Sequence, residues 1–238
     1  MKIYKLEDEV SDDETDLVIT DLRQGVKNPN RVNVFVNLRF AFSLDVAQVV
    51  DLKLKIGLVL TEEELTRCKK ASEFGKTYQR ALEWVLIRPR SVWELKDYLK
   101  RRERKKEIEE RKREWQDKRE QKPEKRKVQE KYDFDDVIIE RLVSKGYVDD
   151  RKFAEYYVEN RFVKKGISRK RLKMELMKKG VTKEIIGEVL NGRNDEEEID
   201  KIIAKKRDKY DDEKLISYLC RQGFEYQLVQ SRVARGKD

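Results

Sequence analysis

The chain has 238 residues, of which 44% are charged and 38% hydrophobic, and its formal net charge is +9. Such a high charged fraction leaves room for only a modest core and implies much solvated helix surface. The chain contains no histidine, so the commonest general base and the usual nitrogen ligand of zinc are both missing. The composition therefore argues against an enzyme and favours a protein that binds a partner.

Membrane-spanning and secretory patterns are not found in the sequence. No apolar run approaches the roughly 20 residues that span a bilayer, and the acidic residues near the N-terminus do not fit a secretory signal. Cys68 and Cys220 belong to no CxxC motif, so we expect two free thiols in a reducing compartment. The expectation is a cytoplasmic protein with no membrane partner.

The N-terminal part changes from acidic to strand-forming. Residues 1–16 carry a net charge of −5, and we expect a flexible acidic tail. Apolar residues at every second position from Val32, with turn residues before them, predict a small antiparallel sheet over 17–44. This sheet would form the core of a β-rich module at 17–70.

Helical signals begin after the sheet. A short helix is expected at Val46–Leu52, and Thr61 followed by Glu64 has the pattern of an N-terminal capping box. Apolar residues at helical spacing then predict a helix over 73–87.

A helical unit recurs along the rest of the chain. Each copy has a helix-starting residue and two leucines four positions apart, and the copies are offset by 77 and 43 residues. The leucine pairs are Leu95 and Leu99, Leu172 and Leu176, and Leu215 and Leu219. Gly180 and Gly223 end the second and third copies, as expected of helix C-terminal glycines.

These patterns predict a mainly α protein of tandem three-helix repeats with a small β-rich module and a charged helical insert. The expected repeats span 73–146, 147–192 and 193–238. Their helices are expected at 73–87, from 92 onward, 133–145, 150–163, 169–179, 183–190, 195–209, 212–222 and 225–234. Stacked helical repeats usually bind partners over an extended surface rather than catalyse.

The charged insert interrupts the first repeat at about 100–133. Residues 100–131 carry a net charge of +7, and Glu103 stands where the other copies have glycine. The helix that starts after Ser91 can therefore continue through Lys100–Gln121, which is rich in good helix formers, until Pro123 breaks it. Disorder is the alternative for this segment. Trp115 lies within it, where a core is not available.

Two arginines mark the junction before the second helix of the first repeat. Arg88 and Arg90 flank a proline, and guanidinium groups suit bidentate contact with phosphate or carboxylate. The alternative is a cap with intramolecular ion pairs. Ser91 with Glu94 has the spacing of a capping box.

The densest basic stretch of the folded part lies in the second repeat. It straddles a turn and a helix N-terminus, where backbone N–H groups also favour anions. Its candidate residues for binding phosphate or an acidic protein groove are Arg161, Lys164, Lys165, Arg169, Lys170, Arg171 and Lys173. An ordinary solvated face is the alternative.

Candidate metal ligands and cofactor motifs are sparse. Asp149 and Asp150 are adjacent carboxylates, but one ion needs several oxygen ligands, and we expect Asp149 to cap the next helix and Asp150 to complement its dipole. The sequence has no phosphate-binding loop, dinucleotide-binding or zinc motif. We expect no catalytic residue, no metal and no cofactor.

The chain resembles the RecX family of bacterial recombination regulators. The similar stretches cover about 17–99 and 132–235, and they include Arg31–Val36, Arg88–Leu95, Gly146–Ala154, Lys179–Val181 and Lys214–Phe224. The charged insert and the missing first-repeat glycine depart from the family pattern.

The resemblance implies a non-enzymatic regulator of homologous recombination and DNA repair. Such a protein would bind the RecA filament on single-stranded DNA and inhibit its assembly, ATP hydrolysis and strand exchange. The implied partners are RecA and single-stranded DNA, with double-stranded DNA as a further one. Two other classes stay open: a stand-alone DNA- or RNA-binding protein that uses the insert and the second repeat, and a metal-dependent nuclease, for which no carboxylate cluster is found.

Overall fold

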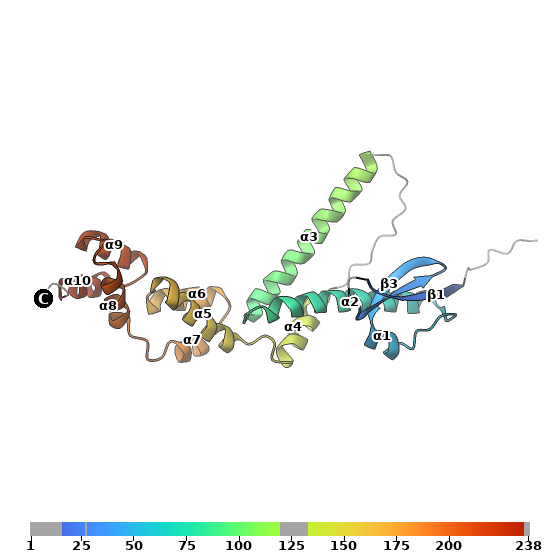
Figure 1. Cartoon of the computed structure of the whole chain (residues 1–238), viewed down its shortest axis with the longest axis horizontal. Helices are drawn as coiled ribbons and strands as arrows, with labels where there is room; N and C mark the ends of the chain where they lie inside the picture. Colours follow the sequence, from blue (N-terminus) through green and yellow to red (C-terminus); the bar gives the residue numbers. More distant parts are fainter. Residues whose placement is uncertain (1–15, 27, 120–132, 236–238) are drawn as a thin grey trace, which may run out of the picture. The chain divides into compact units, whose positions relative to one another are not determined.

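A computed structural model describes residues 16–26, 28–119 and 133–235 (Figure 1). The described part is mainly helical and has one small sheet near the N-terminus, as the sequence predicted. The chain divides after Arg80 into two compact units. Within the described residues, no helix is long and apolar enough to cross a membrane.

The N-terminal unit contains a four-stranded antiparallel sheet. Its strands are β1 (Leu17–Gln24), β2 (Arg31–Val36), β3 (Arg39–Asp45) and β4 (Val59–Leu60), in the order β3-β2-β1-β4. The predicted sheet over 17–44 is confirmed, and the predicted short helix is α1 (Val46–Asp51), which follows β3 directly. The N-terminal residues 1–15 lie outside the described part of the chain.

The core of this unit lies between one face of the sheet and the first turns of α2 (Glu62–Leu86). Ile19, Val34 and Leu44 are fully buried and pack with Cys68 of α2. Alternate side chains of a strand point to opposite faces of the sheet. The apolar residues of β2 at every second position from Val32 therefore lie on the face that packs against the core. The Ser72 hydroxyl donates to the Ser43 carbonyl at 2.6 Å and ties α2 to β3.

Helix α2 begins earlier than the sequence analysis predicted. We expected its start at residue 73, but it starts at Glu62 because Thr61 and Glu64 form the capping box that the spacing indicated. The Glu64 N–H donates to the Thr61 hydroxyl, and the Thr61 N–H donates to the Glu64 carboxylate. No proline follows this cap before Pro89, so the helix continues through Gly75 into the apolar stretch that had marked the predicted start.

The second unit consists of helices in the part that the structure describes. They are α3 (Val92–Arg119), α4 (Asp135–Ser144), α5 (Asp150–Lys165), α6 (Arg169–Lys178), α7 (Lys183–Val189), α8 (Asp195–Lys206), α9 (Asp212–Arg221) and α10 (Tyr226–Arg235). Each predicted helix of this unit is confirmed to within a few residues at its ends. Figure 1 shows α5–α7 and α8–α10 as successive groups along the chain.

The recurring leucine pairs form the centres of the helical cores. Leu95, Leu172, Leu176, Leu215 and Leu219 are completely buried, and Leu99 is 2% exposed. The second pair packs with Phe153 and Ile186 from α5 and α7, and the third packs with residues of α8 and α10. Because residues four apart share a helix face, both leucines of a pair point into the same core.

The two repeat-ending glycines are required by their surroundings as well as by their backbone. Gly180 has φ +77° and Gly223 has φ +92°, the left-handed region that favours glycine. A Cβ at Gly180 would lie 2.7 Å from the Cβ of Trp93, and one at Gly223 would lie 2.7 Å from the Ser168 hydroxyl. Each glycine therefore ends a helix and lets the preceding repeat approach closely.

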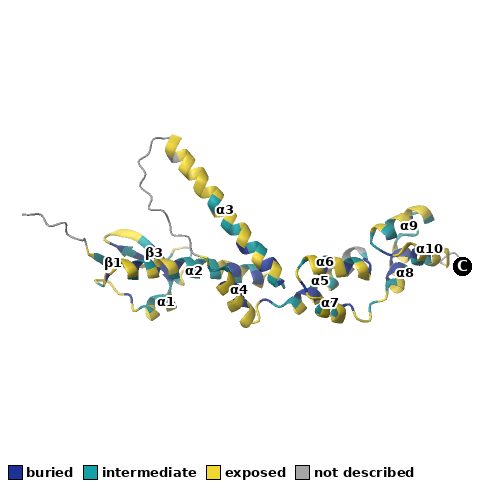
Figure 2. Cartoon of the chain, turned by 180° about the vertical axis from the view of Figure 1, so that it is seen from behind, coloured by how far each residue is buried: buried dark blue, intermediate teal, exposed yellow. Residues whose placement is uncertain are grey.

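Helix α3 passes Glu103 without a break and continues to Arg119, so the predicted extension of this helix is confirmed over that range. The part beyond Arg102 is mostly exposed (Figure 2). The predicted turn near Pro123 falls outside the described residues.

Candidate functional site

The predicted candidate residues before α3 belong to a network around one buried carboxylate. Glu94 is 7% exposed as a residue, and its oxygens lie 3.1 Å from Arg88 Nη1, 3.1 Å from Lys179 Nζ and 3.8 Å from Arg90 Nη1. The Glu94 N–H donates to Ser91 as the capping-box spacing predicted. The Glu94 carboxylate does not complete that box but accepts from Arg88. Because Lys179 ends α6, the network joins two repeats.

The electrostatics of this network agree with a structural role. Burial opposes ionisation of Glu94, but hydrogen bonds from Arg88 and Lys179 outweigh it, and the pKa of Glu94 lies below its ordinary value. Burial, helped by the neighbouring Arg88 charge, lowers the pKa of Arg90. The Arg90 guanidinium also lies 3.9 Å from the centre of the Trp84 ring. Arg88 and Arg90 are thus engaged inside the molecule.

A second contact joins the same two repeats through Asp150. Its Oδ1 accepts from the Val92 N–H at 2.9 Å, so Asp150 caps α3 rather than its own helix. Asp149 caps α5 as predicted, accepting from the N–H groups of Arg151 and Lys152. Burial, with the charge of Asp149, raises the pKa of Asp150, and the Val92 N–H opposes the rise.

The same contact recurs one repeat later. Asn194 caps α8, and the next residue, Asp195, accepts from the Arg169 N–H of α6 at 2.8 Å. In both junctions the first residue of a repeat's first helix caps the second helix of the repeat before it. The sequence analysis missed this role, although a signal exists, since Asp149-Asp150 and Asn194-Asp195 have the same pattern 45 residues apart.

The predicted basic cluster of the second repeat divides into three parts. Arg171 is half-buried and donates to Glu175 at 3.4 Å and to the Arg221 carbonyl at 2.6 Å, so it joins the second and third repeats. Arg169, Lys170 and Lys173 are exposed on α6. Arg161, Lys164 and Lys165 belong to the last turns of α5, and their side chains lie outside the part that the structure describes.

The exposed surface of α6 combines positive charge with methionine. Lys170, Lys173, Met174 and Met177 have the spacing of one helix face, and Met174 and Met177 are 52% and 44% exposed. Flexible, polarisable methionine suits surfaces that adapt to a partner. We name Arg169, Lys170, Lys173, Met174 and Met177 the α6 surface.

The backbone at the start of α6 adds less to anion binding than the sequence analysis assumed. The Arg169 N–H donates to Asp195, and the Arg171 N–H donates to the Ser168 hydroxyl at 3.2 Å. These donors are already used within the chain, and Asp195 adds a negative charge beside them. Any anion at the α6 surface would therefore be bound by side chains.

Comparisons with known proteins agree with this repeat architecture. Residues 149–190, which contain α5–α7, match a family model for the second three-helix domain of RecX, and residues 17–61 match one for the N-terminal domain of regulatory protein RecX. Both matches, together with the curated relatives, support assignment of the chain to the RecX family. A crystal structure of regulatory protein RecX shares the fold, with a TM-score of 0.60 at 19% identity over 90% of this chain and 97% of that one.

Curated RecX proteins align over most of the chain. Regulatory protein RecX of Listeria monocytogenes serotype 4a is 26% identical over 90% of this chain and 73% of the relative. The Listeria welshimeri protein is 28% identical over 76% of this chain, and the alignment spans 58% of that relative's length. The Bacillus pumilus protein is 26% identical over 92% of this chain and 78% of the relative. All three relatives are named regulatory proteins.

Proposed function

We propose that this chain regulates homologous recombination by binding the RecA filament on single-stranded DNA and inhibiting its assembly, ATP hydrolysis and strand exchange. The proposal is supported by the similarity to the RecX family and by the α6 surface. A ligand that binds one state of a filament better than another shifts assembly by that difference in affinity, so catalytic groups are not required. We propose no catalytic residue and a cytoplasmic location.

The observation that carries the proposal is the way successive repeats are joined. Asp150 and Asp195 connect each repeat to the one before it, and Arg171 and Glu94 reach the end of the next repeat's second helix. Contacts of this kind hold neighbouring repeats in register, as a partner with repeated subunits would require. The α6 surface lies in the middle repeat, where it would meet acidic protein surface or DNA phosphate.

The direct test is ATP hydrolysis by the cognate RecA on single-stranded DNA, titrated with substoichiometric amounts of this protein. The DNA is kept in excess, so competition for DNA cannot imitate inhibition. We expect strong inhibition by the wild type and at least tenfold weaker inhibition by the triple variant R169A/K170A/K173A. Absence of inhibition by the wild type would overturn the proposal.

A matched variant controls for the loss of positive charge. Lys145, Lys152 and Lys183 are exposed lysines outside α6, and K145A/K152A/K183A removes the same formal charge. This control is expected to inhibit like the wild type. Equal weakening by both triple variants would show that overall charge, rather than the α6 surface, determines binding.

A second candidate function is stand-alone DNA or RNA binding, which the basic composition of α3 favours. The second half of this helix is rich in exposed Arg and Lys. Tight nucleic-acid binding without RecA, largely lost on deletion of 100–131, would support this function. It would replace the first proposal only if ATP hydrolysis by RecA were unaffected.

A further inference from the structure

The outer part of α3 separates its charges onto different faces. Successive residues of an α-helix are about 100° apart, so positions spaced three or four residues apart form a stripe. One stripe contains only basic and apolar side chains: Arg104, Lys105, Ile108, Arg111, Lys112 and Trp115. We name these six residues the α3 stripe. Glu103, Glu107, Glu110 and Glu114 form another stripe at the same helical spacing.

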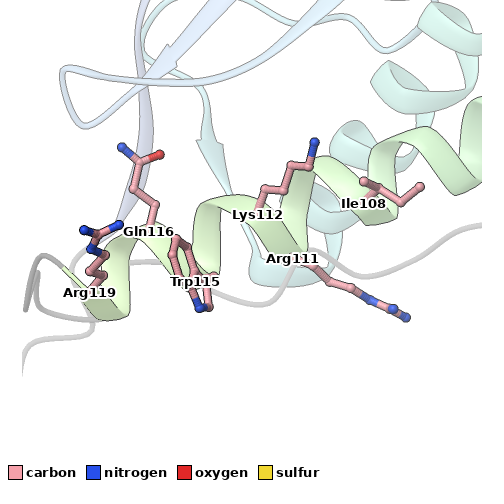
Figure 3. Close-up of a pocket in the computed structure, with 6 residues that line it drawn as sticks. All are labelled: Ile108, Arg111, Lys112, Trp115, Gln116 and Arg119. Carbon is pink, nitrogen blue, oxygen red and sulfur yellow. The ribbon is translucent and has the colours of Figure 1, made fainter.

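The apolar members of the α3 stripe lie on its midline and are open to solvent. Trp115 is 65% exposed and Ile108 is 52% exposed, and they are two turns apart. Figure 3 shows both side chains along the helix with Arg111, Lys112 and Arg119 around them, lining a shallow pocket. The Arg119 guanidinium lies 5.6 Å from the centre of the Trp115 ring. A large aromatic ring is thus presented between cations on an exposed helix.

The chemistry of the stripe fits a polyanion that also has flat, unpaired rings. Arg and Lys bind backbone phosphates, and an exposed indole stacks on a base of any sequence. Duplex DNA supplies phosphates but hides its base faces, and an acidic peptide supplies carboxylates without stacking partners. A lipid surface is disfavoured because two apolar residues give little area to insert.

We propose that the α3 stripe is a binding site for single-stranded nucleic acid, in which the basic side chains bind phosphates and Trp115 stacks on a base. From Arg104 to Trp115 the stripe is about 17 Å long, given a rise of about 1.5 Å per residue. This length suits a few nucleotides, at the lower end of known single-strand site sizes. The inference deepens the second candidate function by naming its site and ligand, and it does not require RecA.

The test is fluorescence anisotropy of a labelled oligothymidylate titrated with the full chain in the absence of RecA. W115A is expected to bind roughly 5- to 150-fold more weakly, the range given by loss of one stacked base. R111A/K112A is expected to weaken binding and to reduce the slope of log affinity against log salt by about 1.4, for two lost phosphate contacts.

A matched double variant on the same helix distinguishes an effect of the α3 stripe from an effect of overall charge. K106A/R113A also removes one Lys and one Arg, but at positions on the side of α3 away from the stripe. This control is expected to bind the oligonucleotide like the wild type. Equal losses from R111A/K112A and K106A/R113A would overturn the proposal. Circular dichroism of each variant confirms that helix content is unchanged.

Binding of duplex DNA and of lipid vesicles distinguishes single-stranded nucleic acid from other ligands of the α3 stripe. Duplex of the same length is expected to bind more weakly than the single strand and to respond little to W115A. Binding of vesicles with anionic lipid but not of the oligonucleotide would overturn the proposal, as would equal affinity for duplex and single strand with W115A unchanged.

Failure of this proposal and failure of the filament proposal have different signatures. If R111A/K112A loses oligonucleotide binding but still inhibits ATP hydrolysis by RecA, both proposals hold for separate surfaces. If the wild type binds the oligonucleotide through the stripe but has no effect on RecA, only the filament proposal fails. If the wild type inhibits RecA but does not bind the oligonucleotide, only the α3 proposal fails.

Discussion

Two equivalent positions in successive repeats carry opposite charges. The basic side chains near one position form internal ion pairs, whereas most of those described near the other are exposed. Glu94 is the third residue after Ser91, and Arg171 is the third residue after Ser168. Both reach the end of the second helix of the next repeat, Glu94 through Lys179 and Arg171 through the Arg221 carbonyl. The contact between repeats is therefore kept while the sign of the charge changes.

The sign of the charge at this position determines whether neighbouring basic side chains are engaged inside the molecule or exposed. Around Glu94, the guanidinium groups of Arg88 and Arg90 turn inward to a buried carboxylate. Arg171 instead pairs with Glu175, which is only partly buried, and Lys170 and Lys173 remain exposed. Arg and Lys are denser in the second repeat than around Glu94, yet Arg88 and Arg90 are the side chains engaged inside the molecule, so the available counter-charge, rather than the number of basic residues, separates structural from accessible positions.

The largest expected effect is on stability at Glu94. We expect E94Q to lower the free energy of unfolding by about 3 kcal/mol, because it leaves three cations around a buried site without their shared anion. Urea unfolding followed by circular dichroism measures this. The exposed Glu110 on α3 gives the control E110Q, expected to change stability by about 0.5 kcal/mol or less. A loss no larger than that of the control would mean that the network does not stabilise the fold.

The contribution of Glu94 is expected to depend on pH with a defined sign. Because its pKa is lowered in the folded state, its stabilising effect is present above the ordinary carboxyl pKa and is lost as pH falls through the lower, folded value. The difference in unfolding free energy between wild type and E94Q should be constant near neutral pH and shrink below about pH 4. A difference that grows on acidification would contradict the direction of the shift.

A smaller effect is expected at the junction caps. D195A removes the acceptor for the Arg169 N–H and should lower stability by about 1 kcal/mol, and D150A should behave similarly at Val92. Asp208 is exposed in the turn after α8, so D208A serves as the control. If D150A and D195A were as neutral as D208A, the recurring contact would not hold the repeats together.

The smallest effect on stability is expected at the α6 surface. R169A/K170A/K173A removes exposed side chains and should change the free energy of unfolding by about 0.5 kcal/mol or less. R90A, by contrast, removes a partly buried guanidinium that contacts both Glu94 and Trp84, and it should cost about 2 kcal/mol. Comparable losses in the two variants, measured by the same urea unfolding, would remove the distinction between the regions.

Local patterns in the sequence predicted much of the fold. Leucine pairs such as Leu172 and Leu176 identify a buried helix face, and Gly180 identifies a helix end, because both signals depend on residues close in the chain. The continuation of α3 past Glu103 followed from the absence of a stop signal.

The candidate site was less predictable because its contacts join distant segments. A carboxylate at residue 94 has no local sign that Lys179 will approach it, and Asp150 has none that it will cap Val92. The α3 stripe, by contrast, is visible in the sequence once charges are placed at 100° intervals. Apolar spacing alone does not reveal it, because Ile108 and Trp115 are too few to form a seam.

The most direct test of the account measures two properties of one variant, R169A/K170A/K173A: its unfolding by urea and its inhibition of RecA ATP hydrolysis on excess single-stranded DNA. We predict an unfolding midpoint equal to that of the wild type, together with at least tenfold weaker inhibition. Undiminished inhibition, or a loss of inhibition accompanied by a matching loss of stability, would contradict the claim that the α6 surface is the accessible binding region.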